Sequence, residues 1–373
     1  MRPAGGRLVS LAFALSGAAC NVVRPLPDAG PGFTIPDAGA PDGAWTELVL
    51  LAGQPGATGR EDGFGPGARF DNPQGVAAAA GAIFVADSSG STLRRFEPDG
   101  GAVRTVAGIP GVPGALDGTG DGAAFDAPAG LAAGAQGILY LADSGNHAIR
   151  RVDTATLSVS TVAGRLGIAG SADGVPGEFR LPRGVAWDGA GALYVADSGN
   201  DTVRRVDLAT GGVTTVAGTA GRPGDADGPA ADAGFNDPGG IAADGAGHVF
   251  VADTGNDTLR EIDLDAGVVS TLAGSPRAIG SDDGPGSGAR FAVPLGLTLD
   301  GQGGLLVADS QNGTIRRVAL GDGNDVSTIV GVPTQQSIAP GPLPASLDAP
   351  SALALDPAGH LLLLDDDALL EVR

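Results

Sequence analysis

Residues 138–150 read Ile-Leu-Tyr-Leu-Ala-Asp-Ser-Gly-Asn-His-Ala-Ile-Arg, an apolar run that ends in an aspartate and leads into a turn sequence. The aspartate recurs at steps of 54 or 56 residues, as Asp87, Asp143, Asp197, Asp253, Asp309 and Asp365. A second marker, three residues before a proline, keeps the same period at Phe70, Phe125, Phe179, Phe235, Phe291 and Leu347. Similarity at a fixed period predicts a repeat architecture.

Each repeat contains four candidate β-strands. In the second repeat they cover residues 130–133, 138–142, 148–152 and 159–163, and Gly, Asp, Ser and Asn separate them as turns require. The second strand is apolar throughout, which is typical of a strand buried on both faces. Four-stranded units arranged around an axis form a β-propeller. The sequence therefore predicts an all-β fold, a six-bladed β-propeller of four-stranded blades.

The two ends of the repeat region predict how the ring closes. The last repeat stops after its third strand, near residues 369–372, and lacks a fourth. Residues 47–53, Glu-Leu-Val-Leu-Leu-Ala-Gly, are similar to the fourth strands at residues 103–108 and 213–218. We expect this N-terminal strand to complete the last blade, which would protect both terminal units from exposing a strand edge. The propeller would then span residues 45–373.

Several repeats resemble a known family. Pro128 to Ala132 followed by Leu139 to Arg150 resembles the NHL repeat, and residues 182–204 and 238–260 match almost as well. The resemblance covers all six units, and the chain is identified as a bacterial exported member. It implies a six-bladed propeller that serves as a protein-binding or RNA-binding platform or, less often, as an enzyme. The first repeat departs at residues 89–91, and the last departs at residues 365–367 and lacks the arginine.

The N-terminal region has an export pattern. Arg2 and Arg7 precede an apolar stretch at residues 8–15, and small residues then lead to Cys20, the one cysteine of the chain. We expect residues 1–20 to be a signal peptide of lipoprotein type. Cys20 would then be lipidated as the first mature residue, and the protein would be exported to the cell envelope. The alternative is a plain secreted protein in which Cys20 has no role.

A second region separates this signal from the repeats. Residues 21–44 are rich in Pro, Gly and Asp, with Pro-Asp-Ala-Gly at residues 27–30 and 36–39. Such a segment has little apolar surface to bury, so it predicts a disordered tether. The sequence thus predicts a propeller held to a membrane only through a lipid anchor.

The charge argues against two classes of partner. The net charge is −21, from 43 acidic and 22 basic residues, and every basic residue is arginine. Nucleic acid and anionic membrane surfaces bind clustered positive charge. We therefore expect no nucleic-acid partner, and we expect a monomeric propeller.

Two sets of aspartates recur with the blades. The aspartate that ends the second strand is followed seven residues later by an arginine in five repeats, so we expect an internal charge-assisted hydrogen bond rather than a ligand site. The second set precedes a glycine, at Asp62, Asp117, Asp173, Asp227 and Asp283. These pairs favour tight turns over calcium-binding loops, although Ca²⁺ stays open as a cofactor. No other cofactor and no metal ligand is predicted.

One face of the ring is expected to bind. The turn after the second strand and a connection of about 17 residues after the fourth strand emerge on the same side, and such long loops commonly bind something. The residue after each repeated proline would ring the channel mouth there. Its variable members Arg183, Gln74 and Ser351 are the ligand-binding candidates. Arg183 would anchor an anionic group or pair with an aspartate of the neighbouring blade.

The composition offers little for catalysis. The chain has no lysine, and His147 is expected on the opposite side from His248 and His360, so the three histidines cannot share one metal. We assign no catalytic residue. The main hypothesis is a non-catalytic scaffold at the cell envelope that binds a protein, peptide or glycan through the long-loop face. The alternative is a carboxylate- or calcium-dependent hydrolase, lactonase or lyase acting at the channel mouth.

Overall fold

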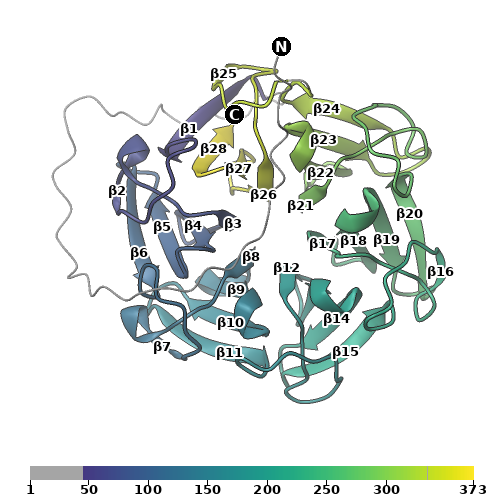
Figure 1. Cartoon of the computed structure of the whole chain (residues 1–373), viewed down its shortest axis with the longest axis horizontal. Helices are drawn as coiled ribbons and strands as arrows, with labels where there is room; N and C mark the ends of the chain where they lie inside the picture. Colours follow the sequence, from purple (N-terminus) through teal and green to yellow (C-terminus); the bar gives the residue numbers. More distant parts are fainter. Residues whose placement is uncertain (1–44, 334) are drawn as a thin grey trace, which may run out of the picture.

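The structure is a computed structural model that describes residues 45–333 and 335–373. The predicted signal peptide, Cys20 and the tether lie outside the described residues. Six antiparallel sheets stand like spokes around a central channel, and successive sheets follow the chain around the ring (Figure 1). The prediction of an all-β, six-bladed propeller is confirmed. No helix in the described ranges is long and apolar enough to cross a membrane.

Five blades are built from four consecutive strands, ordered from the channel outward. Blade 1 contains β3 (Pro73–Ala79), β4 (Ala82–Asp87), β5 (Thr92–Glu97) and β6 (Ala102–Ala107). Blade 2 contains β8 (Pro128–Ala133), β9 (Ile138–Asp143), β10 (Ala148–Asp153) and β11 (Ser158–Gly164). Blade 3 contains β12 (Pro182–Trp187), β13 (Ala192–Asp197), β14 (Thr202–Asp207) and β15 (Gly212–Ala217). Blade 4 contains β17 (Ile241–Ala243), β18 (His248–Asp253), β19 (Thr258–Asp263) and β20 (Val268–Gly274). Blade 5 contains β21 (Pro294–Leu299), β22 (Gly304–Asp309), β23 (Thr314–Ala319) and β24 (Val326–Val330).

Blade 6 closes the ring with a strand from the other end of the described chain. Its sheet contains β26 (Pro350–Leu355), β27 (Leu361–Asp365), β28 (Ala368–Val372) and β1 (Glu47–Gly53). Strand β1 runs antiparallel to β28, with Leu48 opposite Val372 and Leu50 opposite Leu370. The two strands lie side by side, purple against yellow, in Figure 1. The predicted closure is therefore present, and β28 has a partner on both sides.

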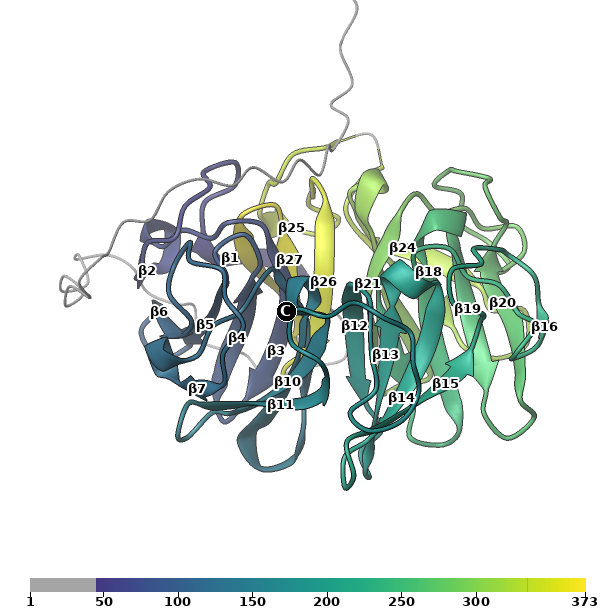
Figure 2. The same ribbon diagram turned by 60° about the horizontal axis from the view of Figure 1, so that its bottom comes forward.

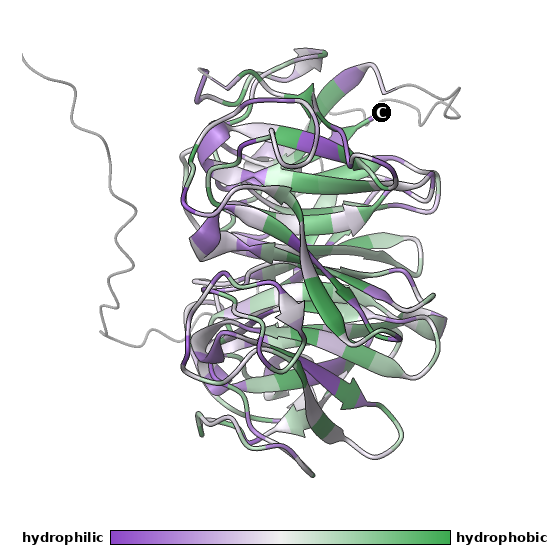
Figure 3. Cartoon of the chain, turned by 90° about the vertical axis from the view of Figure 1, so that its right-hand side faces the viewer, coloured by the Kyte–Doolittle hydropathy of each residue, from purple (hydrophilic) through white to green (hydrophobic). Residues whose placement is uncertain are grey.

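The core lies between neighbouring blades, because each sheet buries both faces against the next. One cluster joins Phe84 and Ala86 of blade 1 to Leu139 and Leu141 of blade 2. The second strand of each blade has the deepest position, which explains why its sequence is apolar throughout. Hydrophobic colouring accordingly concentrates along the strands, and polar colouring appears mainly in turns and loops (Figure 3).

The connections between blades are more ordered than the sequence suggests. Four of them add a short outermost strand to their sheet, β2 (Gly63–Phe64), β7 (Gly118–Thr119), β16 (Gly228–Pro229) and β25 (Gly341–Pro342). In the other two, Gly174 and Gly284 make isolated bridges to the outer strand. The long connections are therefore partly β-structure at the rim and not loops throughout.

Single-turn 3₁₀ helices shape several of the remaining turns. Four of them directly follow the aspartate that ends a second strand, η4 (Ser144–Asn146), η5 (Ser198–Asn200), η6 (Thr254–Asn256) and η7 (Ser310–Asn312). The others are η1 (Gly65–Gly67), η2 (Gly120–Gly122) and η3 (Ala135–Gly137).

Candidate functional site

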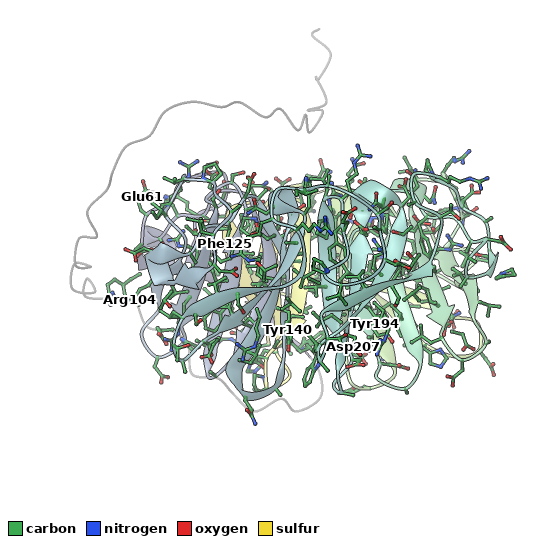
Figure 4. The ribbon with its side chains drawn as sticks, turned by 90° about the horizontal axis from the view of Figure 1, so that it is seen from below. Glu61, Arg104, Phe125, Tyr140, Tyr194 and Asp207 are labelled. Atoms are coloured by element: carbon green, nitrogen blue, oxygen red, sulfur yellow. The ribbon has the colours of Figure 1, made fainter. Side chains whose placement is uncertain are left out.

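The propeller has two different faces. The turns after the second strands and the first halves of the blade connections lie on one face, which we call the long-loop face. The hairpins that join strands one to two and three to four lie on the other, the short-turn face. Glu61 lies toward the first and Asp207 toward the second in the side view of Figure 4. Figure 2 shows the ring from an intermediate angle, with loops above and below the upright strands.

Blades 1 to 5 each contain one buried arginine with two aspartates, which we call the arginine cluster. In blade 3, Arg204 Nη1 lies 2.8 Å from Asp197 Oδ2 and Arg204 Nη2 lies 2.7 Å from Asp173 Oδ1. The guanidinium carbon also lies 5.5 Å from the ring centre of Phe179. Both repeated sets of aspartates therefore meet at one cation, and the repeated phenylalanine covers it. The arginines are Arg94, Arg150, Arg204, Arg260 and Arg316.

The clusters also hold the chain where it enters each blade. Asp197 Oδ1 accepts the N–H of Arg180, and Asn200 donates to Asp197 Oδ2 and to the carbonyl of Gly170. The same pattern of charge-assisted bonds recurs around the ring, so these carboxylates are committed to internal partners. The Asp-Gly carboxylates are occupied as well, since Asp173 Oδ1 also accepts from the Thr215 hydroxyl. The geometry thus gives these aspartates a role in holding the fold.

Burial is the main influence on the second-strand aspartates. Desolvation raises their pKa values above the ordinary aspartate value of 3.8, and the neighbouring arginine opposes the shift in blades 1 to 5. Asp365 of blade 6 has no such arginine. Burial, together with the charges of Asp348 and Asp366, raises its pKa to about 6, and only two backbone N–H groups, from Asp348 and Ala349, lower it.

The raised pKa of Asp365, about 6 like those of Asp87, Asp143 and Asp253, predicts a pH dependence of stability in blade 6. A carboxyl whose pKa is raised by folding contributes stability below pH 4 and loses that contribution as the pH rises through about 6. The contribution of Asp365 amounts to about 3 kcal/mol, since one pKa unit is about 1.4 kcal/mol. We expect Asp365→Asn to reduce the loss of unfolding free energy between pH 4 and pH 8 by about 1–3 kcal/mol. Urea unfolding of wild type and Asp365→Asn at both pH values measures this change. The same pH dependence in the two proteins would contradict the prediction.

The predicted channel-mouth residues lie where the inner strands begin. Pro182 is opposite Asp197, but the register then shifts before Val185 meets Val195, so Arg183 sits in a bulge that turns its side chain out of the ladder. The next residue is glycine in five blades. A Cβ on Gly130, for example, would lie 2.4 Å from the carbonyl oxygen of Arg183. Backbone therefore packs directly on backbone at the neck of the channel.

The three candidate ligand-binding residues have modest contacts. Arg183 Nη1 lies 3.0 Å from Asp237 Oδ2 of the next blade, and the two side chains are 36% and 46% exposed. Gln74 donates to Asn72, and Ser351 donates to the carbonyl of Pro73. The structure places all three at the start of an inner strand, on the long-loop face. Arg183 bridges two blades there, and its guanidinium remains accessible to an anionic ligand.

The channel behind this mouth is apolar. A cavity of about 280 Å³ is lined by the middle and end of the six inner strands, with residues such as Val76, Leu131, Ile241 and Leu353. The lining set contains one hydroxyl, that of Thr298, and no charged side chain among the described residues. This part of the channel therefore offers no acid or base for catalysis.

Exposed apolar side chains mark the loop tips. Ile168 is 52% exposed and Ile279 is 67% exposed, and Ile109 and Val112 are also exposed. The tips are fixed from below, because Gly167 N–H donates to the carbonyl of Asn146, and other blades have equivalent bonds. These residues were absent from the candidates drawn from the sequence. Their signal is only an apolar residue within a Gly/Pro-rich loop, which sequence alone cannot distinguish from a buried anchor.

The comparisons with known proteins agree with this architecture. The NHL repeat matches residues 235–261, which cover most of blade 4. NHL repeat-containing protein 2 of Homo sapiens is 30% identical over 288 residues, 68% of this chain and 39% of that protein. The chain spans less than half the length of the curated relatives it matches.

Solved structures show the same fold at lower identity. A Bacteroides thetaiotaomicron protein of unknown function is similar over 88% of this chain and 76% of its own, with a TM-score of 0.69 and 22% identity. An auxiliary nutrient binding protein of Bacteroides ovatus covers 88% of this chain and 77% of its own, with a TM-score of 0.65 and 13% identity. The chain is thus a six-bladed β-propeller with an NHL repeat match in its fourth blade and with NHL repeat-containing relatives.

Proposed function

We propose that this propeller is a non-catalytic binding scaffold that takes a protein or peptide on its long-loop face. The observation that carries the proposal is the set of exposed apolar side chains on rigidly held loop tips, Ile109, Val112, Ile168 and Ile279. The buried core of a protein interface is more apolar than the rest of the surface, so these side chains are candidates for its anchors. A glycan remains the second ligand class of this proposal, and the cell envelope its proposed location.

The polar groups near the channel mouth favour a ligand-binding role over a catalytic one. Arg183 and Asp237 neutralise each other, and the repeated aspartates bind arginines, so neither set offers a free acid and base pair. The auxiliary nutrient binding protein of Bacteroides ovatus has the same fold, which is consistent with a binding role. A hydrolase, lactonase or lyase at the channel mouth is the competing proposal. It would require a carboxylate pair or a calcium ion, and Gln74, Arg183 and Ser351 contain no carboxylate.

Screening a library of random peptides for binding tests the proposal. A phage-displayed peptide library and a glycan array are probed with the immobilised protein, which separates the two ligand classes. We expect peptides to be enriched, and Ile168→Asp to weaken their binding at least about tenfold, because apolar anchors carry most of the energy at interfaces. Val268→Asp is the matched control, since Val268 is 39% exposed but lies at a short-turn hairpin.

The binding of the selected peptides to the two variants decides whether the long-loop face is the binding site. Peptides that bind wild type and Val268→Asp but lose affinity for Ile168→Asp support the long-loop face. Equal loss in both variants, or enrichment no greater than on an unrelated protein, would reject it. Arg183→Ala adds a second test: selected ligands that carry a carboxylate should lose affinity, and neutral ligands should not.

A further inference from the structure

The short-turn face of blade 6 brings together an aspartate, a histidine and a glutamate. Asp356 begins the turn between β26 and β27, and its Oδ1 accepts the N–H groups of Ala358 and His360. His360 stands just before β27, and Glu371 lies on the adjacent strand β28, opposite Leu362. Trp45 donates from its indole to the carbonyl of Gly359 and so fixes the same turn.

The three side chains have the spacing of metal ligands. His360 Nδ1 lies 3.1 Å from Asp356 Oδ2 and 3.4 Å from Glu371 Oε1. Two ligands at about 2.0–2.1 Å from a tetrahedral ion are about 3.3 Å apart. One donor atom from each residue lies within 4.8 Å of the others, and no other three histidine, cysteine or carboxylate side chains in the described ranges form such a group.

Burial of these side chains is energetically unfavourable unless positive charge lies beside the two carboxylates. His360 is 2% exposed, and the Glu371 and Asp356 side chains are 11% and 20% exposed. Two carboxylates withdrawn from water need compensating positive charge, of which Arg373 supplies part through its ion pair with Glu371 Oε2 at 3.9 Å. His360 Nδ1 faces the two carboxylates, and Nε2 is buried without a hydrogen-bond partner in the described part of the chain, so no bond from Nε2 fixes the tautomer of the imidazole.

The equivalent positions of blades 3 and 5 have an arginine in place of Glu371. Glu371 faces Leu362 across the ladder, just as Arg317 faces Leu306 in blade 5. Arg317 Nε lies 2.7 Å from Asp300, which occupies the place of Asp356. In blade 3 Arg205 takes the position of Glu371, opposite Tyr194, and Asp188 takes that of Asp356. In blade 6 a glutamate replaces the arginine, a second carboxylate is gained, and a histidine joins them; Arg373 is the protein cation beside the group, with its Nη1 3.9 Å from Glu371 Oε2.

We propose that Asp356, His360 and Glu371 bind one divalent transition-metal ion, and that Zn²⁺ is the occupant. Imidazole nitrogen with carboxylate oxygen suits Zn²⁺ better than the all-oxygen sites of Ca²⁺ or Mg²⁺. Three protein ligands leave a fourth tetrahedral position for water, and the partly exposed Asp356 provides the approach. The ion ties the turn after the innermost strand to β28, the strand that β1 joins to close the ring.

Blade 4 provides a matched internal control. Asp244, His248 and Glu261 occupy the same three positions, and His248 Nδ1 lies 3.0 Å from Glu261 Oε1. The site is more open, with His248 40% exposed, and it faces a cavity of about 320 Å³. Its residues are not gathered closely enough to join the group of mutually adjacent donors. Blade 4 should therefore bind Zn²⁺ much more weakly than blade 6.

Titration of the tag-free full-length protein, stripped with EDTA, tests the site. Calorimetry with ZnCl₂ should give one tight site per chain, and Co²⁺ should produce the absorption bands of tetrahedral coordination. Zn²⁺ at about 100 times its Kd should raise the Tm by about 3–6 °C, since it binds only the native state. Glu371→Gln and Asp356→Asn, which keep side-chain size, should lose the tight site and the Tm shift. Glu261→Gln should keep both.

Three results would overturn the proposal. One is a wild-type Tm and heat of titration that are the same with Zn²⁺ as with EDTA, which would leave only a structural ion-paired triad. Another is a Glu371→Gln variant that binds Zn²⁺ as tightly as wild type. The third is loss of the tight site in Glu261→Gln, which would place the ion in blade 4. Wild-type Co²⁺ spectra decide the question even where a variant fails to fold.

Discussion

Replacing Arg204 by methionine lowers the free energy of unfolding by about 3–5 kcal/mol, because it leaves a buried carboxylate without its cation. Arg204 is fully buried, and it bonds Asp197 at 2.8 Å, Asp173 at 2.7 Å and the carbonyl of Glu178 at 2.9 Å. Methionine fills a similar volume and keeps contact with Phe179, so the change removes charge and hydrogen bonds more than packing. Urea unfolding at neutral pH measures the loss.

The next residue in the same strand is the control. Arg205 is 40% exposed and its Nη1 lies 3.9 Å from Asp207, so Arg205→Met should cost no more than about 1 kcal/mol. Adding Asp197→Leu to Arg204→Met should recover part of the loss, since the orphaned charge is then removed as well. Equal effects of the two arginine variants would show that the arginine cluster contributes little to stability.

The propeller fold could be predicted because every blade repeats the same local sequence pattern. The apolar run at residues 138–142 is recognisable without its neighbours, and it is one of six copies at a nearly fixed period. Closure could be predicted because residues 47–53 resemble a fourth strand where the last repeat lacks one. In contrast, Gly118 and Thr119 form a strand of two residues, which is too short for a periodic pattern and depends on pairing with β11.

The arginine clusters were predictable only in part. The seven-residue spacing of Asp143 and Arg150 spans one turn, so their contact follows from local structure. Asp117 is 33 residues from Arg150 and reaches it only after the connection has folded back along the rim. One signal was present in the sequence. The sixth repeat has Leu347 for phenylalanine, Pro340 for the Asp-Gly aspartate and no arginine, so the three partners are lost together.

The blade 6 triplet could not be found by sequence spacing. Asp356 and His360 are four residues apart, but Glu371 joins them only through the register of β27 with β28. The histidines by themselves do not mark the triplet, because no two of them lie in the same blade. The structure instead assigns His248 and His360 to separate carboxylate groups, and the useful comparison is between glutamate and arginine at one ladder position.

Deleting residues 45–53 is expected to abolish cooperative folding at 37 °C. The deletion removes β1, whose Leu48 and Leu51 are buried in the core on the two sides of blade 6. Loss of a buried leucine side chain costs about 2–5 kcal/mol, so the two together approach the whole stability of a typical domain. The edge of β28 would also be left without a partner, which exposes its backbone groups to aggregation. Thermal unfolding followed by circular dichroism measures the effect.

A synthetic peptide with the sequence of residues 45–53 turns this deletion into a reversible test. The peptide should occupy the gap beside β28, restore a cooperative transition and raise the Tm as its concentration increases, because it binds only the closed ring. A scrambled peptide of the same composition cannot place Leu48 and Leu51 in their two clusters and should have no effect. The truncated protein could instead melt at the wild-type temperature without any peptide. In that case five complete blades and a three-stranded sixth blade are enough to keep the ring closed, and β1 is not needed for closure.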